Sequence, residues 1–152
     1  MRIRKVEAGD LESLMALYRD LNVDDLAPTP ERAREVWTQI LAEESVRLLV
    51  GELDGALVAS CVLVLVPNLT RGGRPYALIE NVVTVAEHRK KGFATAILRH
   101  ALEEAWARDC YKVMLLSGSR REETLAFYER AGFQRGVKTG FVAYPPIPKG
   151  AL

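Results

Sequence analysis

The sequence is poor in the side chains that build metal and redox sites. Its 152 residues include two cysteines, Cys61 and Cys110, and two histidines, His88 and His100. The cysteines lack the spacing of metal ligands, and we expect them to be buried, reduced thiols of a cytoplasmic protein. His88 falls in a predicted loop and His100 off the apolar face of a predicted helix. We therefore predict no metal site and assign neither histidine a catalytic role.

The chain also lacks an excess of charge and a long apolar run. The formal net charge is +1, so no general attraction to nucleic acid or to a membrane surface is expected, and any anion site must be local. The longest apolar run, Ala56 to Val66, is much shorter than the roughly 20 residues of a transmembrane helix. The N-terminus, Met1 to Arg4, lacks the apolar core of a signal peptide. These absences favour a cytoplasmic protein.

The composition is that of one domain. Hydrophobic residues make up 49% of the chain and charged residues 27%, which suffices for a substantial core. We expect a domain over 1–144 and a Pro-rich arm over 145–152, because proline cannot join the interior of a sheet. Hydrophobic periodicity, helix caps and turn residues predict the elements. The predicted strands are 3–6, 46–53, 56–66, 76–85, 112–116 and 137–144, and the predicted helices begin at Asp10, Thr29, Gly92 and Glu122.

The stretch from Val82 to Thr95 predicts an anion site. An apolar, β-branched run ends at Val85, the charged residues 87–91 follow, and Gly92 opens a helix. Unpaired amides and the positive end of the helix dipole would meet here, and glycine lets a ligand approach the backbone. The strand after this helix implies a parallel pair. The element order gives an α/β (α+β) domain with a mixed sheet, and the loop is a candidate pyrophosphate site.

Two motifs in this order resemble the GNAT superfamily of N-acetyltransferases. Arg89-Lys90-Lys91-Gly92-Phe93-Ala94 fits the family's loop pattern of Arg or Gln, two residues, Gly, one residue, and Gly or Ala, and the family-like segment Thr124 to Phe133 follows. Ala86, often Pro, and Ala94, often Gly, depart from the common pattern. The resemblance implies an acyltransferase of the EC 2.3.1 class with a single-domain acyl-CoA N-acyltransferase fold. In that fold about four helices flank a central mixed, mostly antiparallel sheet.

The resemblance also implies acetyl-CoA as the acetyl donor. The loop amides would hold its pyrophosphate, with help from the Thr95 hydroxyl. In the family, the strand that matches Val82 to Thr84 separates from its neighbour, pairs with the pantetheine and polarises the thioester carbonyl, as an oxyanion hole does. The residues implied for cofactor binding are Val82, Val83, Thr84, Arg89, Lys90, Lys91, Gly92, Phe93, Ala94 and Thr95.

Glu80 is the candidate general base. It lies in an otherwise apolar strand, two and four residues before Val82 and Thr84. Period-two alternation puts these three residues on one face unless a bulge intervenes. A carboxylate there would be partly desolvated and its pKa raised, which suits a base that takes a proton from an amine. The alternative is a glutamate at a solvated edge or in a structural salt bridge.

Tyr128 is the candidate general acid. It matches the family tyrosine near the sulfur, and its phenol could give a proton to a thiolate of similar basicity. The alternative is a buried aromatic residue that holds the last helix to the sheet. The polar, basic turn Ser117 to Arg121 could contact cofactor phosphate or an acidic substrate, although the Asn that family members often carry near Arg121 is absent.

The acceptor is indicated by one short segment. Ile79 to Val83 is similar to the Ile-Glu-Asp-Val-Val segment of glucosamine-6-phosphate N-acetyltransferases, which use its Glu-Asp-Val part against substrate at a dimer interface. The similarity implies an acceptor site lined by Glu80, Asn81 and Val82, and the family implies a homodimer. The leading hypothesis is direct attack of a small-molecule primary amine on the acetyl-CoA thioester. Acetylation of a protein N-terminus or lysine, in a groove made by loops 22–28 and 71–75, and a non-catalytic acyl-CoA-binding module both stay open.

Overall fold

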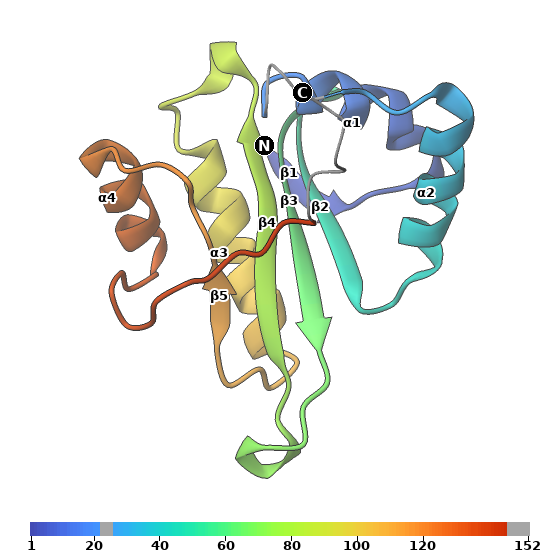
Figure 1. Cartoon of the computed structure of the whole chain (residues 1–152). Helices are drawn as coiled ribbons and strands as arrows, with labels where there is room; N and C mark the ends of the chain where they lie inside the picture. The colour runs from blue at the N-terminus through green and yellow to red at the C-terminus, as the bar shows by residue number, and fades with distance from the viewer. Residues whose placement is uncertain (22–25, 146–152) are drawn as a thin grey trace.

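The protein is built on a single mixed sheet. The computed structural model describes residues 1–21 and 26–145 (Figure 1), so part of the predicted loop 22–28 and most of the predicted arm lie outside the described residues. The strand order is β1-β2-β3-β4-β5, antiparallel throughout except for the parallel pair β4–β5. The predicted mixed, mostly antiparallel sheet is confirmed. The strands are β1 (Arg2–Lys5), β2 (Val46–Leu53), β3 (Ala56–Val66), β4 (Tyr76–Thr84) and β5 (Val113–Leu115).

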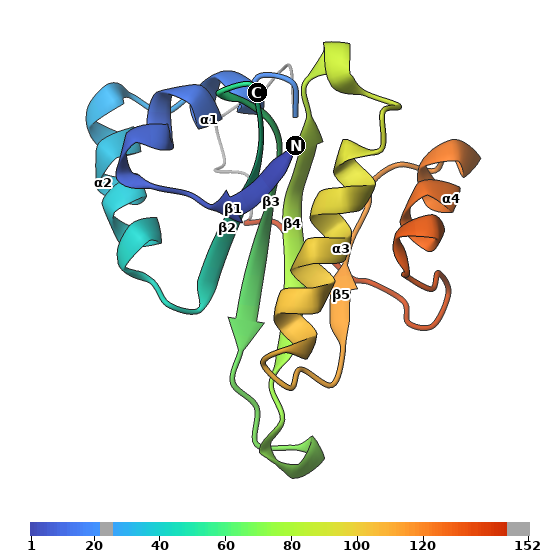
Figure 2. The ribbon, with the colours of Figure 1, turned by 180° about the vertical axis from the view of Figure 1, so that it is seen from behind.

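Helices cover both faces of the sheet. In Figures 1 and 2, α1 and α2 lie on one face, α3 lies on the other, and α4 lies beside α3 and β5. Within the described residues, no helix is both long enough and apolar enough to cross a bilayer. The described helices are α1 (Leu11–Tyr18), α2 (Pro30–Ala42), α3 (Phe93–Trp106) and α4 (Glu122–Ala131), with the short 3-10 turns η1 (Ala8–Asp10), η2 (Arg71–Gly73) and η3 (Ala86–His88).

Alternation along the strands divides the core into two layers. One layer packs under α3, and the other packs under α1 and α2. The α3 layer includes Leu49, Cys61, Leu63, Ile79, Ile97, Leu98 and Ala101. The α1–α2 layer includes Leu14, Leu17, Trp37, Leu48, Val50 and Val83.

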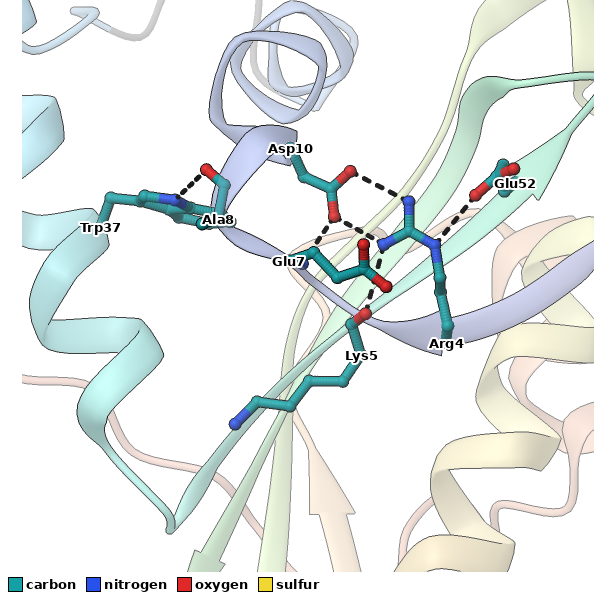
Figure 3. A network of polar contacts seen from close by, with 7 residues as sticks. All are labelled: Arg4, Lys5, Glu7, Ala8, Asp10, Trp37 and Glu52. Atoms are coloured by element: carbon teal, nitrogen blue, oxygen red, sulfur yellow. Dashed lines mark hydrogen bonds and ion pairs between the residues drawn. The ribbon is translucent and has the colours of Figure 1, made fainter.

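An ion-pair network joins the start of α1 to the sheet (Figure 3). Arg4 Nη1 lies 2.6 Å from Asp10 Oδ2, and Arg4 Nε lies 2.9 Å from Glu52 Oε2 on β2. Asp10 stands at the N-cap of α1 as predicted, but its carboxylate accepts from the Glu7 amide at 2.7 Å instead of from an α1 amide. The hydrogen bond from Arg4 holds the pKa of Asp10 below its usual range. The cap therefore stabilises the turn before α1 and ties it to β1 and β2.

The predicted strand over Val137–Tyr144 is wrong. Residues 137–145 form no strand, and they cross the sheet on the face opposite α3 (Figures 1 and 2). The reason is that β5 is three residues long and offers a short edge for pairing. The segment instead packs Gly140 onto Leu116, where a Cβ at position 140 would lie 2.6 Å from Leu116 Cδ2. Exposed apolar side chains in this segment are Val137, Phe141, Val142 and Tyr144.

Candidate functional site

β4 and β5 separate halfway along β4. Their pairing joins Ala77–Ile79 to Val113–Leu115, whereas β4 continues to Thr84. Within the described part of the chain, residues 80–84 have no strand partner on the β5 side. Backbone groups on that side are therefore available to a ligand, since such groups need partners, except for the Thr84 carbonyl, which accepts from Arg89. The separation that the family resemblance implies is confirmed.

A β-bulge changes the faces of β4 at this separation. Asn81 and Val82 stand opposite the single residue Cys61 on β3. Asn81 has φ +52°, a left-handed conformation that Asn adopts more readily than most side chains. Because of the extra residue, Val82 packs on the α3 side, while Glu80 lies opposite Val62, which packs on the α1–α2 side. Glu80 and Val82 therefore do not share a face, as they would in a strand without a bulge.

Glu80 is exposed where the two strands part. The partial desolvation expected from its apolar neighbours in sequence is wrong. Regular alternation after Ile79, which packs under α3, puts the Glu80 side chain on the opposite face, and no described strand covers it on the β5 side. A carboxylate at this opening can take a proton from a bound amine directly or through one water.

Tyr128 reaches the same region from α4. Its half-buried ring lies 4.8 Å from the Phe127 ring and 6.4 Å edge-on from the Phe133 ring, measured between centroids. Burial raises the pKa of the Tyr128 hydroxyl, hydrogen bonding with Ser117 opposes the rise, and the charge of Glu80 adds to it. The structure thus brings the predicted acid and base close enough to interact electrostatically. A phenol that stays protonated at neutral pH can donate to a thiolate.

The loop before α3 presents a group of unpaired amides. Lys90 has φ +63° and Gly92, the N-cap of α3, has φ +84°. The first amide with a helical acceptor is that of Ala96, 3.0 Å from the Gly92 carbonyl. Among the described residues no acceptor is recorded for the amides of 90–95. Left-handed residues beside a helix N-terminus form an anion-binding concavity, which agrees with the predicted pyrophosphate site.

The charged side chains of this loop contact protein atoms. Arg89 donates to the carbonyls of Asp20 and Thr84. Lys90 Nζ lies 3.7 Å from a Glu123 carboxylate oxygen on α4. Lys91 Nζ lies 3.4 Å from His88 Nδ1. Each of these side chains thus has a contact within the protein, although that of Lys90 is 85% exposed, and the amides of the loop are its unpaired donors within the described part of the chain.

The residues present fit acetyl-CoA. A Cβ placed at Gly92 would meet no heavy atom within 4 Å, so the space beside the loop is open. The Thr84 hydroxyl is buried and has no hydrogen-bond partner among the described residues. The Val83 side chain is buried in the α1–α2 core, so only the backbone of Val83 can contact a ligand. An open loop, a free strand edge and an unpaired hydroxyl suit an extended ligand with a pyrophosphate at one end.

Tyr18 lies near the site, although no motif in the sequence marks it as a site residue. The apolar stripe of its helix predicts a core position, and its ring does pack there. Burial raises the pKa of its hydroxyl, and the nearby polar groups of Ser60 and Asn81 oppose that rise. The end of α1 therefore lies beside the strand that carries Glu80. A phenol in the last turn of an otherwise apolar helix face is the signal that could have identified it.

Known proteins resemble the chain in both sequence and structure. The model of the acetyltransferase (GNAT) family matches residues 11–133. A glucosamine 6-phosphate N-acetyltransferase of Trypanosoma brucei brucei is 31% identical over 134 residues, which are 88% of this chain and 89% of that protein. A solved structure of a candidate acetyltransferase from Agrobacterium tumefaciens str. C58 has a TM-score of 0.91 at 42% identity, covering 95% of this chain and 100% of that one. Glucosamine-6-phosphate N-acetyltransferase from Arabidopsis thaliana has a TM-score of 0.82 at 22% identity, covering 94% and 97%.

These similarities extend over nearly the whole domain. The matched residues 11–133 contain the amide-rich loop, the separated strand and Tyr128. The Arabidopsis structure, at its lower identity, shows the shared fold. The chain belongs to the acetyltransferase (GNAT) family and is an N-acetyltransferase, an acyltransferase of the EC 2.3.1 class.

Proposed function

We propose that this enzyme transfers the acetyl group of acetyl-CoA to a primary amine of a small molecule. The observation that carries the proposal is that the free edge of β4 at 80–84 occurs together with the unpaired amides of 90–95. The extended pantetheine arm can pair with the free edge of β4 as an added strand, and the pyrophosphate can bind to the amides of 90–95. The proposed cofactor-binding residues are Val82, Val83, Thr84 and 89–95. Bound acetyl-CoA supplies an acetyl group activated as a thioester.

Three parts of the chain perform the proposed chemistry. Glu80 takes a proton from the incoming ammonium, directly or through water, and frees the nitrogen lone pair for attack on the acetyl carbon. Backbone N–H groups on the free edge of β4 donate to the acetyl oxygen as negative charge develops there. As the C–S bond breaks, Tyr128 donates its phenolic proton to the departing sulfur, and the proton that the attacking nitrogen must still lose returns to the Tyr128 oxygen, directly or through water. The products are an amide, a free thiol and the proton that Glu80 passes to solvent.

The acceptor proposed first is an amino sugar phosphate. A relative 31% identical over most of both chains is a glucosamine 6-phosphate N-acetyltransferase. Glu80, Asn81 and Val82 are the residues proposed to line the acceptor site, and the first two are exposed at the strand separation. These observations favour a small molecule held beside β4 over a peptide.

A thiol-release assay with a panel of acceptors tests this function. The panel contains glucosamine 6-phosphate, glucosamine, amino acids, polyamines, aminoglycosides and peptides. We expect release with a small amine, and most strongly with the amino sugar phosphate. Release with peptides alone would contradict the proposed acceptor class. Calorimetric binding of CoA without release for any acceptor would instead indicate a non-catalytic acyl-CoA-binding module.

We also propose that the enzyme is a homodimer. The segment after α4 carries four exposed apolar side chains, with Phe141 89% and Tyr144 85% exposed. Side chains of this kind gathered on one segment are typical of a protein contact. Sedimentation equilibrium should give twice the mass of the chain, and the double variant Phe141→Ser, Tyr144→Ser should shift it toward the monomer. A wild-type monomer at micromolar concentration would contradict the proposal.

A further inference from the structure

Arg89 joins three parts of the molecule at the open end of β4. Its Nε donates to the Thr84 carbonyl at 3.2 Å, and its Nη2 donates to the Asp20 carbonyl at 3.0 Å. The Asp20 carboxylate lies 3.6 Å from the same Nη2. Thr84 is the last residue of β4, and Asp20 lies in the turn after α1. One guanidinium thus connects the cofactor loop, the strand end and the helix end.

Tyr18 supplies a second contact between α1 and the same strand. Its ring packs in the core layer that contains Val83. Both contacts therefore lie on the segment 80–84, the segment without a described partner on the β5 side. A strand segment with one free edge has fewer hydrogen bonds to fix its position than a segment paired on both sides. The contacts from α1 and Arg89 compensate for the missing neighbour.

We propose that Arg89 is a positioning residue whose side chain holds the free edge of β4 in place for the acyl donor. This inference rests on the proposed function. A planar guanidinium has several donors in fixed directions and can serve two carbonyls at once, whereas the ammonium of lysine is a point charge. Asp20 also offsets the positive charge, so less of it acts on a phosphate. The loop then binds pyrophosphate through its amides, while the Arg89 side chain orients the strand.

The variants Arg89→Lys and Arg89→Gln separate the two roles. Lysine keeps the positive charge but cannot bridge the Thr84 and Asp20 carbonyls, and glutamine loses both the charge and the bridge. If Arg89 positions the strand, both variants should lower kcat to a similar extent, about tenfold, since small misplacements of reacting groups are costly. The loss should persist with acetyl-pantetheine, a donor without phosphates. Wild-type turnover by Arg89→Lys, or a loss that disappears with acetyl-pantetheine, would overturn the proposal.

A control variant tests whether any loss of loop charge has the same effect. Lys91→Gln removes one positive charge from the same loop, and its ammonium contacts the His88 ring. Its effect should shrink with acetyl-pantetheine, whereas that of Arg89→Gln should not. Asp20→Asn keeps the accepting carbonyl and should cost less than Arg89→Gln. Two outcomes would contradict the bridge that Arg89 makes between the two carbonyls. One is an equal loss of kcat in Lys91→Gln and Arg89→Gln with acetyl-pantetheine. The other is an equal loss of kcat in Asp20→Asn and Arg89→Gln with either donor.

A measurement without ligand keeps this inference distinct from the proposed function. Amide hydrogen exchange of 80–84 should be several-fold faster in Arg89→Lys and Arg89→Gln than in the wild type, because the strand end has lost its anchor. Exchange in the doubly paired segment 77–79 should change little. Unchanged exchange at 80–84 would refute the positioning role even if acetyl transfer is confirmed. Faster exchange would support it even if every acceptor in the panel fails.

Discussion

The two halves of β4 are adjacent in sequence and differ in surroundings. From Ala77 to Ile79 the strand pairs with β3 on one side and β5 on the other, and these two residues are 0% and 1% exposed. From Glu80 to Thr84 the strand pairs with β3 alone, and Glu80 is exposed. The first half stabilises the sheet. The second half leaves backbone groups for a ligand, so the same strand serves stability at one end and chemistry at the other.

The largest expected effect lies at the loop beside the free half. Gly92→Glu should weaken CoA binding about 100-fold or more, because like charges about 4 Å apart repel by several kcal/mol at an effective dielectric constant near 20. Calorimetric titration with CoA measures the change. The control is Gly55→Glu, since Gly55 has a similar φ of +82° in the β2–β3 turn. Equal affinities in the two variants would show that the loop does not hold the pyrophosphate.

A substitution in the doubly paired half should act on stability. Ile79→Ala removes a large side chain that is 1% exposed, and we expect a loss of about 2–5 kcal/mol in the free energy of unfolding. Urea unfolding measures it. Glu80→Gln, one residue later, should change the stability by less than about 0.5 kcal/mol, as exposed substitutions usually do. Similar losses at both positions would remove the contrast between the two halves.

The same Glu80→Gln substitution should lower turnover. We expect a loss of about 100-fold at neutral pH, within the range for removal of a general base. High pH should partly restore the rate, because the acceptor amine then loses its proton without help. The control is Glu44→Gln, an exposed glutamate before β2. If the pH–rate profile of Glu80→Gln matches the wild type, Glu80 is not the base.

The smallest effect on turnover is expected for loss of the proposed acid, Tyr128. Tyr128→Phe should lower turnover about tenfold with a smaller change in CoA affinity, because the ring keeps its packing. Burial raises the pKa of Tyr128, so the phenol keeps its proton at neutral pH and loses it only in alkaline solution. Wild-type turnover should fall as pH rises through this pKa, and the variant should lack that fall. Tyr111→Phe, at the other end of β5, serves as the control, and equal activity of the two variants would leave Tyr128 a packing role.

The raised pKa of Tyr128 also predicts a direction for stability. The folded state favours the neutral phenol, so the contribution is fully present below the ordinary tyrosine pKa of about 10 and is lost as pH rises through the folded pKa. Comparison of thermal unfolding of the wild type and Tyr128→Phe across this alkaline range checks the sign. The predicted direction would be wrong if the wild type gained stability relative to Tyr128→Phe as the pH rises.

Much of the fold could be predicted because its signals are local. Apolar periodicity located α3, the cap residue Thr29 located the start of α2, and turn residues located the hairpin of 46–53 and 56–66. The exception is the segment after α4, which was predicted to form a strand over Val137–Tyr144. Whether such a segment pairs depends on an available edge, and β5 is too short to provide one. Edge length is a property of the assembled sheet.

Some features of the candidate site could likewise be predicted from local sequence, and others could not. The sequence by itself determined the amide-rich loop, because a glycine at a strand-to-helix junction sets the local backbone whatever surrounds it. It also determined which residue types carry the proposed acid and base. Only the tertiary structure decided that a bulge places Val82 and Glu80 on different faces and that Arg89 bridges two carbonyls. Both depend on contacts between distant segments, since a bulge exists only relative to the partner strand and a bridge only relative to both of its acceptors.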